Sequence, residues 1–278
     1  MPFLILVALP ASLVAFVATG MNGPAGVAVD PQSGHVFVAN TGGPPDLKDN
    51  NGFIRRLDAD GHVIAPRFPT AGKDAVTLHG PKGLAIVNGV LYAADIDTVR
   101  GFDLATGKLK TAIDLSGLGA RSLTGLATGA DGILYVSDTP GNVIYRIDIT
   151  AGNSISLFAQ GPGLAGPTGL AYDPRHKTLV VASRNTGRLL SVQGDGTIHP
   201  LLGRSFVSLY GVAFDRENNL IVTEVERGRV YRIRDYSEVE VLRENVLSPA
   251  GVAYDFRHNR AVVTSLKGNA VFTLPLDR

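Results

Sequence analysis

The stretch GPTGLAYD, residues 166–173, decides the fold because close copies of it recur along the whole chain. Each copy places a glycine at its fourth position, followed by valine or leucine and then by alanine. Recurrence at a period of about 40 residues is typical of repeat architectures. The six glycines, at intervals of 57, 42, 44, 42 and 40 residues, are Gly26, Gly83, Gly125, Gly169, Gly211 and Gly251.

A turn and a second apolar run follow each glycine motif, as in LYVSD (134–138) and LIVTE (220–224). A third apolar run and a less regular fourth one complete each unit. Four short strands per unit of about 40–45 residues are the pattern of a β-propeller blade. The sequence therefore predicts an all-β fold, a six-bladed propeller of four-stranded antiparallel blades, formed by residues 1–278 as a single domain. The interval of 57 residues indicates an insertion in the first blade.

The first twenty residues, MPFLILVALPASLVAFVATG, contain no charged side chain. After Gly251 only 27 residues remain, enough for three strands of the last blade. We expect residues 12–19 to supply its fourth strand by pairing with the strand around Ala270–Leu274, which closes the ring and removes exposed edges. Residues 1–11 are interpreted either as the remnant of a leader, although no lysine or arginine precedes Lys48, or as the result of a wrongly assigned start. A leader would place the protein in the periplasm or outside the cell; without one, the cytoplasm is expected.

The charge balance argues against a nucleic-acid-binding protein, because 26 basic and 25 acidic residues give a net charge of +1 without any basic run. The chain has no cysteine, which excludes disulfides and thiol catalysis. Pro10 interrupts the N-terminal apolar run, so no membrane span is predicted. We expect a monomer.

The stretch LYVSDTPGNVIYRID (134–148) resembles the NHL-repeat propellers, and residues 49–103 resemble the gluconolactonase-like, senescence-marker-protein group. That resemblance implies one divalent metal at the axial mouth, held by Glu, Asn and Asp side chains just before the blade glycines, which polarises a lactone and activates water. Oxygen ligands of this kind suit calcium, magnesium or manganese. The residues at those positions here are Ala25, Lys82, Thr124, Thr168, Tyr210 and Ala250. None is a carboxylate or an asparagine, so we expect no metal at these positions.

Polar residues end the second apolar run of every unit and are expected to form a ring at one end of the propeller. They are Asn40, Asp95, Asp138, Ser183, Glu224 and Ser265. In one interpretation each hydrogen-bonds its own turn, as these residue types do at strand ends. In the other, Asp95, Asp138 and Glu224 bind a cation or act as acid and base, which makes them catalytic candidates together with His79.

Two long loops, 41–52 and 65–82, are expected to meet on this face beside the axis, where long loops commonly carry binding sites. Lys82 is expected to point to the axial mouth, as a counter-ion to the acidic ring or as a site for an anionic ligand group. The segment DLKDNNG (46–52) only partly matches a calcium-binding loop. The candidate ligand-binding residues are Asn40, Asp49, Asn51, Lys73, His79, Lys82 and Tyr210.

Two functional hypotheses remain open from the sequence. The first is a propeller that binds a small molecule, a protein or a peptide at its loop-rich axial face, without a metal or another cofactor. The alternative is a lactonase-type hydrolase with a rearranged axial site that uses calcium or another divalent cation.

Overall fold

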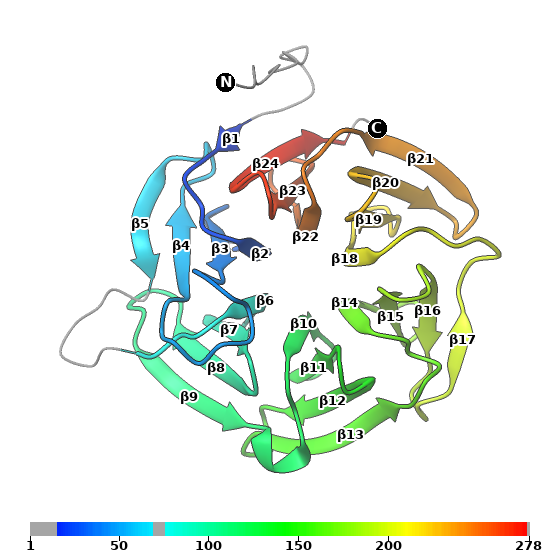
Figure 1. Ribbon diagram of the computed structural model, residues 1–278, viewed down its shortest axis with the longest axis horizontal. Coiled ribbons are helices and arrows are strands. Elements are labelled where there is room, and N and C mark those ends of the chain that lie inside the picture. Colours follow the sequence, from blue (N-terminus) through cyan, green and yellow to red (C-terminus); the bar gives the residue numbers. More distant parts are fainter. Residues whose placement is uncertain (1–15, 69–75, 277–278) are drawn as a thin grey trace.

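The computed structural model describes residues 16–68 and 76–276. Within these ranges the chain forms six four-stranded antiparallel sheets, arranged as blades around a central axis (Figure 1). The predicted all-β, six-bladed propeller is confirmed. The described part of the chain has one short 3₁₀ helix, η1 (Ser116–Leu118), and none of its helices has the length and apolar character to cross a membrane.

The first three blades follow one another along the chain, with the innermost strand first. Blade one contains β2 (Pro24–Val29), β3 (Val36–Asn40), β4 (Phe53–Leu57) and β5 (Val63–Phe68). Blade two contains β6 (Pro81–Val87), β7 (Val90–Asp95), β8 (Thr98–Asp103) and β9 (Leu109–Asp114). Blade three contains β10 (Leu123–Thr128), β11 (Ile133–Asp138), β12 (Val143–Asp148) and β13 (Ser154–Gln160).

The remaining blades repeat this order, except that the outer strand of the last comes from the N-terminal end. Blade four contains β14 (Pro167–Asp173), β15 (Thr178–Ser183), β16 (Leu189–Val192) and β17 (Ile198–Pro200). Blade five contains β18 (Leu209–Phe214), β19 (Leu220–Glu224), β20 (Arg229–Arg234) and β21 (Glu238–Arg243). Blade six contains β22 (Pro249–Asp255), β23 (Arg260–Ser265), β24 (Ala270–Pro275) and β1 (Val17–Ala18).

The blade glycines are explained by the close approach of neighbouring inner strands. A Cβ atom added at Gly26 would lie 1.8 Å from the carbonyl oxygen of Lys82, the residue just before the next blade glycine. The same contact recurs around the ring and closes at Gly251, whose added Cβ would lie 2.7 Å from the Ala25 carbonyl oxygen. Real Cβ atoms are not found so close to backbone, so a side chain at these positions would push the blades apart.

A local bulge accompanies the glycine in every inner strand, because the register with the second strand shifts at this point in all six blades. Where it shifts, a hydroxyl of the second strand joins neighbouring blades. The Gly125 N–H donates to Ser137 Oγ over 2.8 Å, and this hydroxyl donates to the Thr168 carbonyl of the next blade over 2.7 Å. Thr223 makes the equivalent link from blade five to blade six.

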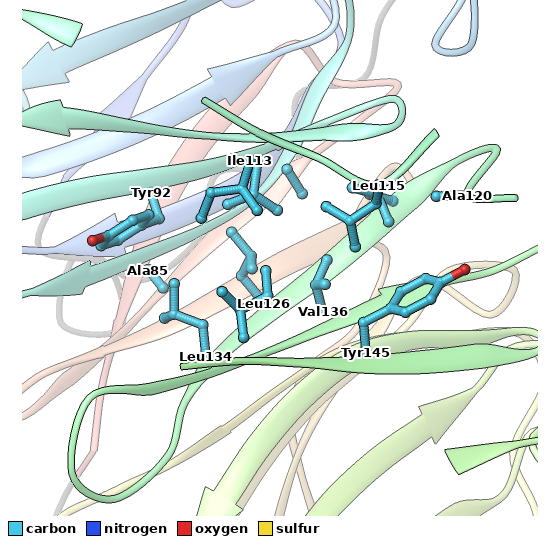
Figure 2. Close-up of a cluster of buried hydrophobic side chains, with 13 residues drawn as sticks. Ala85, Tyr92, Ile113, Leu115, Ala120, Leu126, Leu134, Val136 and Tyr145 are labelled. Carbon is cyan, nitrogen blue, oxygen red and sulfur yellow. The ribbon is translucent and has the colours of Figure 1, made fainter. Parts of the chain in front are cut away.

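The core lies between the faces of adjacent blades rather than in one central mass. Figure 2 shows the cluster between blades two and three, where Leu126, Leu134 and Val136 pack near Ile113 and Leu115. Alternate residues of each strand point into such a cluster on either side, as the period of a strand requires. Every blade is therefore held by both of its neighbours, which keeps the axial ends of the inner strands fixed.

The N-terminal segment closes the ring, as predicted, although the strand is short. In β1, Val17 pairs with Phe272 and Ala18 pairs with Val271 of β24 (Figure 1). Phe16, which is only 9% exposed, lies under the Arg260 guanidinium at 5.2 Å and packs into the cluster between blades six and one. Residues 12–15 of the expected strand, and the expected leader remnant at 1–11, lie outside the described residues.

The prediction that residues 65–82 form one long loop was partly wrong. Its first four residues belong to β5, in which Ala65 pairs with Arg56 and Phe68 with Ile54, and Pro81 and Lys82 begin β6. The sequence did not indicate this strand because Pro66 lies within it, and proline is uncommon inside strands. Proline is tolerated here because β5 is the outer edge of its blade, and because the register shifts beside it.

Candidate functional site

A cavity of about 780 Å³ opens on the axis, at the face where the inner strands begin. Five of the six residues that precede the blade glycines line it: Ala25, Lys82, Thr124, Thr168 and Tyr210. Below it, the six blade glycines surround a channel of about 50 Å³. The repeat therefore places one side chain from each of five blades around a common opening, which we call the axial cavity.

A second set of lining residues comes from the positions just after the second strands. They are Thr41, Thr139, Arg184 and Leu266. Each follows a residue of the predicted polar ring, and side chains alternate direction along an extended chain. The ring residue turns into its own blade, and the next residue turns towards the axis. The sequence analysis chose the ring residues and missed the residues one position later. The alternation of side-chain direction along an extended chain could have identified them.

Lys82 is the most buried charged side chain that lines the axial cavity, with an exposed fraction of 6%. Its Nζ donates to Asp46 Oδ1 over 2.7 Å and to Ser122 Oγ over 2.6 Å. The Ser122 hydroxyl in turn donates to Asp46 Oδ1 over 2.6 Å. Three groups thus bond to one another. They are the ammonium of Lys82 in β6, the hydroxyl of Ser122 just before β10, and the carboxylate of Asp46 in the β3–β4 loop.

Two pKa values reflect this environment. Burial acts to raise the pKa of Asp46, but hydrogen bonds from Lys82 and Ser122 outweigh it, so that the pKa lies below its ordinary value and the carboxylate stays ionised. Burial raises the pKa of Tyr210 to about 12, while Arg184 opposes the rise and Asp46 adds to it. Tyr210 therefore offers a neutral hydroxyl to the cavity at any physiological pH.

Arg184 provides a second positive charge at the rim. Its side chain is exposed and forms no hydrogen bond or ion pair with any described residue. It also borders two further hollows between blades four, five and six. Together with Lys82 it makes the cavity lining more positive than negative, because Asp46 is the only carboxylate among the described lining residues.

The three carboxylates of the predicted ring accept hydrogen bonds from backbone N–H groups near the inner strands of their own blades. Asp95 Oδ1 accepts from the N–H groups of His79 and Gly80, and its Oδ2 bonds to Arg100 Nε. Asp138 Oδ1 accepts from the Ser122 N–H over 2.8 Å. These contacts match the interpretation in which such residues bond their own turns.

Glu224 follows the same pattern. It accepts from the Val207 N–H and from the Tyr231 hydroxyl. Neither it nor the two aspartates line the axial cavity. Asp138 differs in one respect, because its Oδ2 is buried without a partner among the described residues.

The β3–β4 loop reaches across to blade two, as predicted (Figure 1). The Asn50 N–H donates to His79 Nδ1 over 3.1 Å, and Asn50 Oδ1 accepts from the Leu78 N–H. His79 thus lies beneath this loop and does not line the cavity. The sequence was wrong about the partner of Lys82, which bonds to Asp46 of this loop rather than to the acidic ring.

The other predicted binding residues that the structure describes lie apart from the cavity. Asn40 is fully buried and bonds to the Asn22 N–H and the Val38 carbonyl. Asp49 and Asn51 bond to each other at the exposed tip of the β3–β4 loop. Lys73 lies outside the described residues. Of the seven predicted ligand-binding residues, the structure brings Lys82 and Tyr210 to the axial cavity.

The donors of the axial cavity do not suit a divalent cation. Such ions prefer several oxygen ligands that include carboxylates, whereas Asp46 is already bonded to Lys82, whose charge would repel a cation. Elsewhere Asp58, Asp60 and His62 come close together in the exposed turn between β4 and β5. There Asp58 accepts hydrogen bonds from the backbone of the other two, as an ordinary turn residue does.

Comparisons with known proteins identify the fold and leave the site unassigned. No sequence family and no curated protein matches the chain. Among solved structures, a gluconolactonase from Xanthomonas campestris is 16% identical with a TM-score of 0.70, over 96% of this chain and 92% of that chain. A virginiamycin B lyase from Staphylococcus aureus is also 16% identical with a TM-score of 0.66, over 94% and 99% of the two chains.

A third structure, a protein of unknown function from Bacteroides thetaiotaomicron, is 15% identical with a TM-score of 0.72, over 92% of this chain and 70% of that chain. At such identities the likeness extends to the propeller fold alone. The fold supports lyases and hydrolases as well as proteins without a known activity, so function has to be argued from the cavity itself.

Proposed function

We propose that this protein is a non-catalytic propeller that binds a small polar organic molecule in the axial cavity. The observation that carries the proposal is the cavity of about 780 Å³ with converging side chains from all six blades. This volume lies within the range of about 300–1,000 Å³ that is usual for small-molecule sites. The lining combines the hydroxyls of Thr124, Thr139 and Tyr210 with the charges of Lys82 and Arg184.

A small molecule suits the cavity better than a protein or peptide partner. The polar groups project from the ends of inner strands, and neighbouring blades fix those strands on both sides. Such a rigid, concave and hydroxyl-rich opening matches a compact ligand with several oxygen atoms. The Tyr210 hydroxyl has no partner among the described residues and is available to such a ligand.

The arrangement of the four catalytic candidates argues against catalysis in the axial cavity, because none of them lines it. Asp95, Asp138 and Glu224 accept hydrogen bonds from backbone N–H groups and do not line the cavity. His79 accepts a hydrogen bond from the Asn50 N–H of the β3–β4 loop and does not line it either. We also propose that no divalent metal binds at the axis, because the donor set of the cavity is unsuitable for one. The likeness to a gluconolactonase rests on the fold, and the candidate acid, base and metal-binding residues that the structure describes do not line the axial cavity.

The proposal is tested by screening a library of polar metabolites for compounds that raise the melting temperature, followed by titration calorimetry on each compound found. Tyr210→Phe removes one hydroxyl from the cavity and should weaken binding about 5- to 10-fold, as the loss of one hydrogen bond does. Stability should stay unchanged, because no described residue depends on that hydroxyl.

Tyr172→Phe is the matched control. Tyr172 also lies in an inner strand, but at the opposite mouth of the channel, and should leave the affinity unchanged. If Tyr172→Phe weakens binding and Tyr210→Phe does not, the ligand site lies at the other mouth. A protein that binds only a peptide or a protein partner, and none of the small molecules, would also contradict the proposal.

A further inference from the structure

We propose that Lys82 and Ser122 form a binding subsite for the carboxylate of a small organic acid, and that Asp46 occupies this subsite as an internal stand-in. This inference rests on the proposed function and names the ligand class of the same cavity. The ligand would enter with its carboxylate in the place of the Asp46 carboxylate, while its remaining polar groups face the hydroxyls of the cavity wall.

The two residues of the subsite are built to hold an anion. Both are at least nine-tenths buried, with exposed fractions of 6% for Lys82 and 9% for Ser122. Nζ of Lys82 and Oγ of Ser122 both reach the same oxygen, Asp46 Oδ1, and lie 2.6 Å from each other. An ammonium and a hydroxyl that converge on one carboxylate oxygen are a strong, charge-assisted recognition unit.

The Asp46 carboxylate that these two residues hold is, by contrast, exposed and belongs to a surface loop. The Asp46 side chain is 59% exposed, and residues 43–50 of the β3–β4 loop are all exposed. The far end of this loop has its own anchors, an ion pair from Lys48 to Asp97 and the bond from Asn50 to His79. Other contacts of residues 43–47 include the bond from Thr41 Oγ1 to the Gly43 carbonyl oxygen and the packing of Pro45 against Gly80. In this proposal the stretch gives up these contacts and moves away from the cavity while the rest of the loop stays attached.

The burial of Lys82 couples this movement to ligand binding. A buried ammonium without a counter-charge is strongly destabilising, so the departure of Asp46 requires another anion to take its place. A carboxylate satisfies Lys82 and Ser122 as Asp46 does, whereas a neutral molecule does not. Loop opening is thus expected to accompany the binding of organic acids and not that of neutral ligands.

Chemical rescue tests this inference with formate and acetate as probes. Asp46→Ala removes the stand-in and should lower the melting temperature by roughly 5 °C, since about 1 kcal/mol corresponds to a shift of 2–4 °C in a protein of this size. Millimolar formate or acetate should restore at least half of the loss. Acetamide, the neutral counterpart of acetate, and chloride at equal ionic strength should not restore it.

Two further variants provide controls. Asp49→Ala removes a carboxylate from the same loop that does not contact Lys82, and it should show neither the loss nor the rescue. In Asp46→Ala combined with Lys82→Met, the rescue should disappear because the cation is gone. If Asp46→Ala does not fold, Asp46→Asn keeps the shape of the side chain and allows the same measurement.

The inference is wrong if formate and acetate fail to stabilise both Asp46 variants, or if acetamide and chloride rescue equally well. It is also wrong if the rescue persists without the Lys82 ammonium. A neutral ligand whose binding depends on Tyr210 would leave the proposed function standing while this inference fails, so that the two failures can be told apart.

Discussion

The blade glycines carry the fold at the scale of single residues. Each lies so close to a carbonyl oxygen of the following blade that no space remains for a Cβ atom. That carbonyl belongs to the residue just before the next blade glycine, and five of the six residues at this position also line the axial cavity. Two adjacent residues therefore have different roles. The glycine allows neighbouring blades to pack closely, and the residue before it lines the cavity in five of the six blades.

Gly169→Ala should destabilise the protein by about 3 kcal/mol, because its added Cβ would lie 2.3 Å from the Tyr210 carbonyl oxygen and neither inner strand can move freely. Gly194→Ala is the control, since a Cβ there meets nothing within 4 Å, and it should change stability by less than about 1 kcal/mol. Urea denaturation of both variants measures the difference. Equal effects would show that the close approach of the strands does not explain the repeat.

The sequence predicted residue positions better than residue partners. The register confirms that the six polar strand ends are equivalent, since each of them pairs with the first residue of an inner strand. Position follows from the repeat. The partnership of Lys82 with Asp46 could not be predicted, because it joins residues 36 apart in sequence through the path of one irregular loop.

At the scale of elements, β1 determines whether the ring is closed. It pairs through two residues only, so Phe16 beside it is expected to provide most of the attachment. This phenylalanine also lies against Gly61, where an added Cβ would be 2.5 Å from its ring. The strand was found from the sequence because the last unit lacked a fourth apolar run.

Phe16→Ala should cost about 3 kcal/mol or more, as is usual for a large aromatic side chain removed from a packed cluster. Val17→Ala is the matched control in the same segment. Val17 is 59% exposed and should contribute less than about 1 kcal/mol. The free energy of unfolding of the two variants distinguishes them. A small effect of Phe16→Ala would mean that blade six is stable without its N-terminal strand.

At the scale of the whole molecule, the ring of blades holds the axial cavity rigid. Contacts between neighbouring inner strands run from β2 through β6, β10, β14 and β18 to β22 and return to β2. All six blades contribute a side chain to the cavity, the sixth through Leu266 just after β23, so its shape depends on the complete circle. From outside this ring, Asp46 of the β3–β4 loop bonds to Lys82 and Ser122 of the cavity wall.

The absence of a suitable donor set leads to a prediction about metals. Dialysis against EDTA should leave the melting temperature unchanged within about 1 °C, and calcium added back should not raise it, because binding of an ion to the native state would add stability. Elemental analysis of the purified protein should find no stoichiometric divalent metal. A loss of stability that calcium reverses would contradict the proposal that no metal binds at the axis.

The location of a bound ligand tests the central claim most directly. A crystal structure of the protein with a compound from the screen should show that compound in the axial cavity, in contact with Tyr210 and Thr168 and within reach of Arg184. Density for the compound at the opposite mouth, beside Tyr172 and Phe256, or on the outer strands of a blade would contradict the account.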